Sequence, residues 1–83
     1  MSYDKVKQAK KITVGLKQTM KAMERQQIDE VFIARDADVR LLQSIVQACL
    51  KGQVPYIEVD SMKQLGRACN IEVGTAVAGT LKE

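Results

Sequence analysis

The sequence contains no histidine and no tryptophan, and its 83 residues include one proline, one phenylalanine and two tyrosines. Without histidine, the chain lacks the commonest general base and every Ser-His or Cys-His nucleophilic pair. A four-ligand zinc site of the Cys/His kind is also excluded, because Cys49 and Cys69 stand twenty positions apart and form no Cys-X-X-Cys pair. A catalytic site in this chain would therefore have to use carboxylates or lysine alone.

Long apolar runs are absent as well. No segment approaches the roughly 18 consecutive apolar residues of a membrane span, and the first residues contain no apolar stretch typical of a signal peptide. We therefore expect a cytoplasmic protein with reduced thiols. A chain of 83 residues, 46% of them hydrophobic, can bury one modest core but not two, so we expect a single domain over residues 1–83.

Acidic residues are scarce in the first third of the chain. Residues 1–25 include seven basic and two acidic side chains, whereas residues 26–60 carry a net charge of −3 and the whole chain one of +3. A basic segment on an otherwise neutral or acidic body indicates an anionic partner that binds at one place. The same segment could be a solvated lysine-rich helix face, and charge alone does not distinguish the two.

Hydrophobic periodicity divides the chain into helical and strand-like segments that alternate. Runs of β-branched and apolar residues predict strands, and apolar residues three and four apart predict helices. The alternation predicts an α/β protein, a three-layer α/β/α sandwich with a central sheet of about four strands, the last of them central. The predicted helices cover residues 3–10, 16–25, 39–51 and 62–69, and the predicted strands cover 12–14, 31–34, 54–59 and 73–80.

Several residues have the chemistry of helix ends. We expect Asp38 and Ser61 to cap the helices that follow them, and Ser2 to cap the first helix. Gly52 and Asn70 are expected to end the helices that precede them, because glycine and asparagine tolerate the left-handed conformation found there.

The segment from Gly15 to Lys21 has the chemistry of a binding site. The apolar stripe of the predicted helix would face the core and leave Lys17, Gln18 and Lys21 together as one exposed polar patch. Gly15 lets a ligand approach the backbone, and a helix start binds phosphate readily. Gln18 can both donate to and accept from a base edge. The residues of the apolar stripe are Leu16, Met20 and Met23.

Two further groups allow more than one interpretation. The connection formed by residues 71–74 carries apolar residues that either enter the core or form a ledge for an unstacked base. Asp36 and Asp38 could form a carboxylate pair for a metal or for acid/base chemistry. Because no third ligand or histidine accompanies them, roles in a turn and in helix capping are favoured. The cysteines are expected to be small core residues.

Four segments that follow one another along the chain resemble the kink-turn RNA-binding ribosomal protein L-seven-Ae family. They are most similar to its short paralogues in Gram-positive bacteria. The similarity covers nearly the whole chain and implies an α/β/α sandwich. Members of this family bind a kinked RNA duplex with tandem sheared G·A pairs, and the start of their second helix enters the groove at the bend. The segments are GLKQTMK at 15–21, VFIARDAD at 31–38, VPY at 54–56 and LGRAC at 65–69.

The family pattern at the start of the second helix is Gly-X-Asn-Glu-X-X-Lys. Gly15 and Lys21 fit this pattern, whereas Lys17 stands in place of the asparagine and Gln18 in place of the glutamate. The family glutamate accepts hydrogen bonds from guanine N–H groups, and an amide has one acceptor oxygen where a carboxylate has two. The resemblance also implies RNA contacts at Asp38, Ile71, Glu72, Val73 and Gly74.

The resulting hypothesis is a monomeric protein that binds kink-turn or kink-turn-like RNA, in ribosomal RNA or a riboswitch. The resemblance implies that the protein acts by binding and not as an enzyme, and that it uses no metal, organic cofactor, membrane or small-molecule substrate. One alternative is a protein-interaction module of the same fold that docks an acidic partner on the basic patch. Another is a small phosphate-handling enzyme that uses Lys17 or Lys21, although the chain lacks a Walker-type glycine loop.

Overall fold

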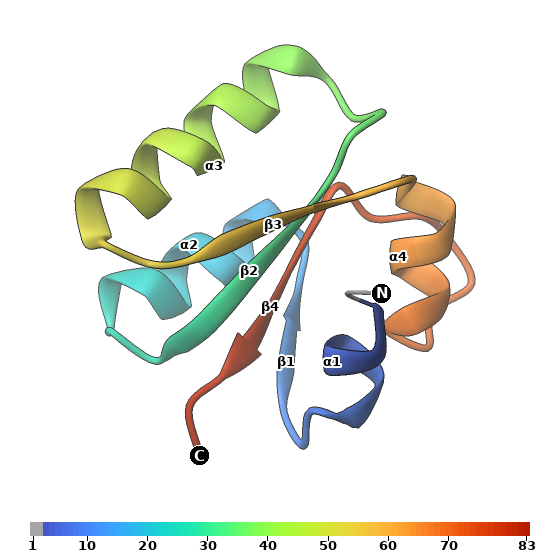
Figure 1. Cartoon of the computed structure of the whole chain (residues 1–83), viewed down its shortest axis with the longest axis horizontal. Coiled ribbons are helices and arrows are strands. Elements are labelled where there is room, and N and C mark those ends of the chain that lie inside the picture. Colours follow the sequence, from blue (N-terminus) through green and yellow to red (C-terminus); the bar gives the residue numbers. More distant parts are fainter. Residues whose placement is uncertain (1–2) are drawn as a thin grey trace.

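The computed structural model describes residues 3–83, which form four helices and one four-stranded sheet (Figure 1). Helices and strands alternate along the chain in the predicted order. The expected cap at Ser2 lies outside the described residues. The helices are α1 (Tyr3–Gln8), α2 (Leu16–Glu24), α3 (Val39–Gly52) and α4 (Met62–Ala68), and the strands are β1 (Ile12–Val14), β2 (Ile28–Ala34), β3 (Tyr56–Val59) and β4 (Val77–Leu81).

The sheet has the strand order β1-β4-β2-β3, so the prediction that the last strand is central is confirmed. β4 pairs antiparallel with both of its neighbours, whereas β2 and β3 are parallel. The first three strands therefore run in one direction and β4 runs in the other. As a result, the carboxyl ends of β1, β2 and β3 and the start of β4 lie at the same end of the sheet (Figure 1).

Helices cover both faces of the sheet, which confirms the three-layer sandwich (Figure 1). Successive side chains of a strand point to opposite faces. In β2, Phe32 and Ala34 accordingly belong to the core beside α1 and α4, and Val31 and Ile33 belong to the core beside α2 and α3. All four are fully or almost fully buried, as expected for an apolar strand covered on both sides.

The face of α2 that lies deepest differs from the predicted one. Leu16, Met20 and Met23 pack against the core but are only half-buried, whereas Thr19 and Ala22 are buried. Gly79 of β4 explains the difference, because a Cβ there would lie 2.7 Å from the Thr13 hydroxyl oxygen and 3.4 Å from the Thr19 methyl carbon. The missing side chain lets the helix approach the central strand closely through Thr19.

The hydroxyl of Thr19 has partners inside this close contact. It donates to the Gly15 carbonyl oxygen at 2.7 Å and shares a hydrogen bond with the Thr13 hydroxyl at 2.9 Å. Buried hydroxyls without partners are costly, so these bonds make a polar side chain acceptable at the centre of the α2 contact. They also tie the first turn of α2 to β1.

Most helix ends follow the sequence prediction. The Asp38 carboxylate accepts from the Arg40 N–H at 2.8 Å, the Ser61 hydroxyl accepts from the Gln64 N–H at 3.1 Å, and Asn70 has a positive φ of 65°. The predicted end of α3 was wrong by one position. Gly52 is its last helical residue, and Gln53, with φ 57°, takes the left-handed conformation.

Strand boundaries were less accurate. β2 begins at Ile28 instead of residue 31, β3 begins at Tyr56 instead of residue 54, and β4 covers Val77–Leu81 instead of 73–80. Residues 73–76 instead belong to the connection from α4, in which the Thr75 N–H donates to the Met62 carbonyl oxygen at 3.1 Å. Pairing with neighbours, more than composition, decides where a strand starts.

Both cysteines are buried, which confirms their expected role as core residues. Burial raises the pKa of the Cys49 and Cys69 thiols, because the charged thiolate is less stable away from water. Over residues 3–83, no helix has the length and apolar character to cross a membrane.

Candidate functional site

The end of the sheet where β4 starts brings together the candidate binding segments. Helices α2, α3 and α4 begin there, directly or a few residues after the carboxyl ends of β1, β2 and β3. The connection from α4 to β4 returns to the same end (Figure 1). Each helix start carries unpaired N–H groups and a partial positive charge, so the topology directs three helix starts toward one end of the molecule.

Gly15 forms an open start for α2. Its φ of 89° and ψ of 163° lie in a region that is essentially restricted to glycine, and its N–H donates to the Val77 carbonyl oxygen at 2.8 Å. An added Cβ would meet no atom within 4 Å, and no side chain caps the helix at this position. The backbone at the start of α2 is therefore accessible, and its first N–H groups can bind an anion.

The side-chain amide oxygen of Gln18 already accepts a hydrogen bond from the backbone. The Val14 N–H donates to the Gln18 Oε1 atom at 3.0 Å, which resembles the backward bond of a capping box. Because Oε1 already accepts from the backbone, the NH2 group is the part of the side chain that is freely available to a ligand. The sequence predicted both a donor and an acceptor, and the geometry favours the donor.

Basic side chains follow one stripe that runs along α2 to Arg25, the residue directly after it. Lys17, Lys21 and Arg25 stand at intervals of four, are exposed, and have no carboxylate oxygen within 4 Å among residues 3–83. Lys21 and Arg25 line a hollow of about 160 Å³ together with Gln18. The structure thus brings the predicted polar patch together and adds Arg25, which the sequence analysis left out although the spacing from Lys21 could have indicated it.

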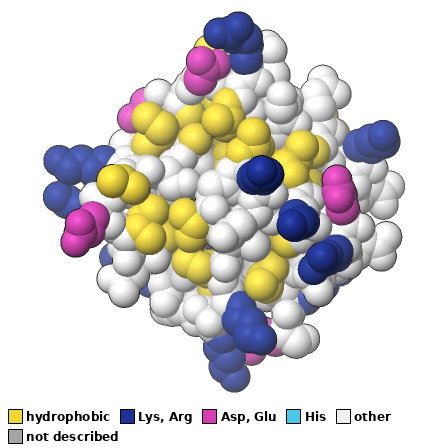
Figure 2. Space-filling view, turned by 180° about the vertical axis from the view of Figure 1, so that it is seen from behind, with side chains coloured by type: hydrophobic (Ala, Val, Ile, Leu, Met, Phe, Trp, Pro, Cys, Tyr) yellow, Lys and Arg dark blue, Asp and Glu magenta, His cyan; other side chains and the backbone are white. Residues whose placement is uncertain are grey.

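The face of the molecule seen from behind carries basic side chains with apolar side chains between them, and acidic side chains lie beside some of the basic ones (Figure 2). Positive charges that are not paired with acidic neighbours raise the local potential and attract polyanions. Apolar surface between such charges is suited to contacts with sugar or base rings, which a phosphate-only partner would not need.

Asp36 and Asp38 each cap a helix, and they cap different ones. Asp38 accepts from the Arg40 N–H in the first turn of α3, whereas Asp36 accepts from the Met62 N–H at 2.9 Å in the first turn of α4. Among residues 3–83 there is no group of three or more metal-ligating side chains. The interpretation of both aspartates as turn and cap residues is therefore the one that the geometry supports.

The connection at residues 71–74 divides between core and surface. Ile71 is half-buried and packs against the core beside α4, which is the first of the two alternatives given above. Val73 is 71% exposed, and Glu72 and Gly74 are exposed as well. Only Val73 therefore remains as an apolar ledge that could face a ligand.

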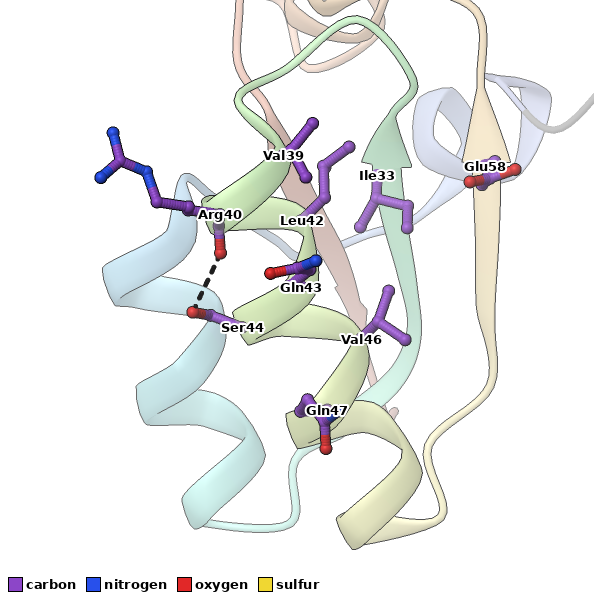
Figure 3. A pocket seen from close by; sticks show the side chains of 9 residues that line it. All are labelled: Ile33, Val39, Arg40, Leu42, Gln43, Ser44, Val46, Gln47 and Glu58. Carbon is purple, nitrogen blue, oxygen red and sulfur yellow. Dashed lines mark hydrogen bonds between the residues drawn. The ribbon is translucent and has the colours of Figure 1, made fainter.

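A hollow of about 730 Å³ lies elsewhere, between α3 and the edge strand β3 (Figure 3). Ile33, Leu42 and Val46 give it an apolar floor, while Arg40 points away from it. The Ser44 hydroxyl on its rim is used within the helix, where it donates to the Arg40 carbonyl oxygen at 3.2 Å. None of the candidate site residues lines this hollow, so it does not belong to the site described here.

Comparison with known proteins assigns the chain to a family. Residues 2–83 match the model of the ribosomal protein L7Ae/L30e/S12e/Gadd45 family, and the chain belongs to this family. The resemblance inferred from the sequence is thereby confirmed.

Relatives and solved structures agree with this assignment. The chain is 45% identical to the RNA-binding protein YbxF of Geobacillus stearothermophilus over 99% of this chain and 100% of the relative. It is 47% identical to an RNA-binding protein of Bacillus pumilus, over 98% of this chain and 99% of that protein. The structure of the Giardia lamblia 15.5kD RNA binding protein matches with a TM-score of 0.88 and 35% identity, covering 99% of this chain and 72% of the other.

We expect Gly15→Ala to lower the free energy of unfolding by about 1–3 kcal/mol, the cost of holding a side chain in a sparsely populated backbone region. Gly52→Ala is the matched control, because its Cβ would make an ordinary 3.6 Å contact with Val54. There, the smaller entropy of the unfolded chain should raise stability by about 0.4–1 kcal/mol. Urea denaturation of the two variants measures both effects. Equal stabilities would show that the start of α2 does not depend on the positive φ of Gly15.

Proposed function

We propose that the protein binds RNA and recognises kink-turn or kink-turn-like structures with tandem sheared G·A pairs, in ribosomal RNA or a riboswitch. The observation that carries this proposal is the start of α2, where the open Gly15 backbone lies beside Lys17 and Lys21, two charges with no carboxylate partner among residues 3–83. Relatives at 45% and 47% identity over nearly the full chain, both named RNA-binding proteins, support RNA as the ligand.

The contacts divide into those that position the RNA and those that read it. Phosphates would bind the free N–H groups at the start of α2 and the charges of Lys17 and Arg25, which fixes the RNA without selecting a sequence. Gln18 and Lys21 line the same hollow and would contact base edges. At the other side of the site, Val73 would support an unstacked base.

The remaining candidate residues would shape the RNA surface more than they read it. Ile71 is held by the core and Gly74 lies against α4, so their contribution is the position of the connection that carries Glu72 and Val73. Asp38 fixes the start of α3 through its bond to the Arg40 N–H and would lie near an extruded base.

The protein would act by binding alone, as a monomer in the cytoplasm, with no metal, organic cofactor or small-molecule substrate. An RNA kink is stabilised when a protein neutralises phosphates that approach one another at the bend, and this requires no chemical step.

The alternative, a module that docks an acidic protein on the same patch, gives a different result in cell extracts. Its partner would remain bound after nuclease treatment, whereas an RNA-dependent association would be lost.

Lys21→Ala should weaken binding to a consensus kink-turn RNA by about 1–3 kcal/mol, the range for a side chain that contacts a base edge well. Alanine is a good helix former, so the substitution should leave α2 intact. Filter binding at fixed salt, with thermal unfolding as a check on the fold, measures the loss.

The control is Lys51→Ala, which removes the same charge from the last turn of α3, at the far end of the molecule. This variant should bind almost as tightly as the parent, because exposed charges beyond a Debye length of roughly 8 Å are screened. If the two variants bind equally well, the site does not lie at the start of α2.

Gln18→Glu should bind a consensus kink-turn at least as tightly as the parent and should prefer tandem G·A pairs more strongly. One carboxylate oxygen can keep the bond from the Val14 N–H, which leaves the second oxygen to accept from a guanine N–H. Charge-assisted hydrogen bonds are roughly twice as strong as neutral ones, and the dipole of α2 favours a negative charge in its first turn by about 0.3–1 kcal/mol.

Binding of both proteins is compared on intact kink-turn RNA and on RNA whose G·A pairs are replaced by Watson–Crick pairs. Gln47→Glu, which adds the same charge on the exposed face of α3, controls for repulsion by phosphates and should not change the ratio of the two affinities. An equal loss of affinity on both RNAs for Gln18→Glu would mean that residue 18 lies near the backbone and reads no base.

A further inference from the structure

The backbone of Met62 joins two connections that are far apart in the sequence. Its N–H donates to the Asp36 carboxylate at 2.9 Å, and Asp36 belongs to the connection between β2 and α3. Its carbonyl oxygen accepts from the Thr75 N–H at 3.1 Å, and Thr75 belongs to the connection between α4 and β4. Both connections lie at the end of the sheet that carries the candidate site. Met62, the first residue of α4, therefore holds the two connections in a fixed position relative to each other.

Glycines bring the second connection down onto α4. A Cβ on Gly66 would collide with the Val73 carbonyl oxygen, and one on Gly74 would lie 3.1 Å from the Met62 carbonyl oxygen. The Ile71 N–H also donates to the Gly66 carbonyl oxygen at 3.0 Å. Residues 71–75 are thus held by backbone contacts with α4, and their position follows the position of that helix.

The start of α4 is fixed in turn by side chains from other parts of the chain. The Tyr3 hydroxyl oxygen accepts from the N–H groups of Asp60 and Ser61 at 3.0 and 3.3 Å. The Ser61 hydroxyl caps the helix locally through the Gln64 N–H. Asp36, which accepts from the Met62 N–H, is the acceptor that comes from the connection between β2 and α3, on which Asp38 also lies.

We propose that Asp36 is a positioning residue for RNA binding: through the backbone of Met62, its carboxylate fixes residues 71–75 relative to the start of α3. Asp36 itself contacts no RNA in this account. The proposal rests on the proposed function for its effect on RNA affinity, whereas its effect on the two connections is a property of the free protein. Ordering a segment before binding raises affinity, because less conformational entropy is lost when the ligand arrives.

Two variants of Asp36 separate geometry from charge. Asp36→Ala and Asp36→Asn remove the same negative charge. Loss of this charge by itself favours the approach of RNA phosphates equally in the two variants. Only asparagine keeps an oxygen that can accept from the Met62 N–H. We expect Asp36→Ala to bind kink-turn RNA about three- to tenfold more weakly than Asp36→Asn, the loss that corresponds to one ordering hydrogen bond.

Amide hydrogen exchange on the free protein gives a second readout that needs no RNA. In Asp36→Ala, exchange should become faster at the Met62 and Thr75 amides. It should stay unchanged at the Val31 amide, which donates to the Pro55 carbonyl oxygen directly before β3. Asp36→Asn should restore slow exchange. Ser61→Ala is the control for simple destabilisation, because it removes a cap of α4 without breaking the bond between Asp36 and Met62.

Each outcome bears on the proposal. Faster exchange at Thr75 in the alanine variant, with rescue by asparagine and a matching difference in RNA affinity, supports it. Unchanged exchange at Thr75, or an equal loss of affinity in Ser61→Ala at equal stability, overturns it. If the parent protein itself binds no kink-turn RNA, the proposed function fails, and the exchange data still decide whether Asp36 couples the two connections.

Discussion

The antiparallel setting of β4 between β1 and β2 is the constraint on which the rest of the structure depends. It makes β1, β2 and β3 run in one direction, so the three helices that follow these strands all begin at one end of the sheet. Helix starts have a partial positive charge, and here each one is reached by a short connection. The same setting returns the chain from α4 to that end, beside the start of α2.

The central place of β4 also explains how closely α2 lies on the sheet. Gly79 leaves room for Thr19, whose hydroxyl bonds to the Gly15 carbonyl oxygen and to Thr13. The first turn of α2 is therefore fixed on the side that faces the sheet, while the absence of a side chain at Gly15 leaves its start accessible to a ligand. A rigid element with an exposed, uncapped start is well suited to binding phosphate, because the N–H groups are already oriented when the ligand arrives.

Much of this arrangement could be predicted from the sequence, because it depends on local signals. The order of elements, the caps at Asp38 and Ser61, and the exposed stripe with Lys17 and Lys21 follow from periodicity and from residue chemistry within a few positions. The resemblance to a known family added the RNA-binding hypothesis, and family membership is confirmed, whereas the roles of single residues stay predictions.

What escaped the sequence analysis depends on contacts between distant segments. Asp36 caps α4, 26 positions away, and nothing near Asp36 in the sequence indicates this partner. The close approach of α2 to Gly79 likewise needs the tertiary structure, and so the deepest residue of that helix was not foreseen. The engagement of Gln18 with the Val14 N–H is local, and the spacing of a capping box could have suggested it.

The central claim is that RNA binds at the end of the sheet where α2 begins. Titrating the isotopically labelled protein with kink-turn RNA, and following its backbone amide signals by nuclear magnetic resonance, tests this claim most directly. The account predicts the largest shifts at the amides of residues 15–21 and 71–74, with little change near Leu50 at the far end of α3. The largest shifts around the hollow between α3 and β3, with residues 15–21 unaffected, would contradict it.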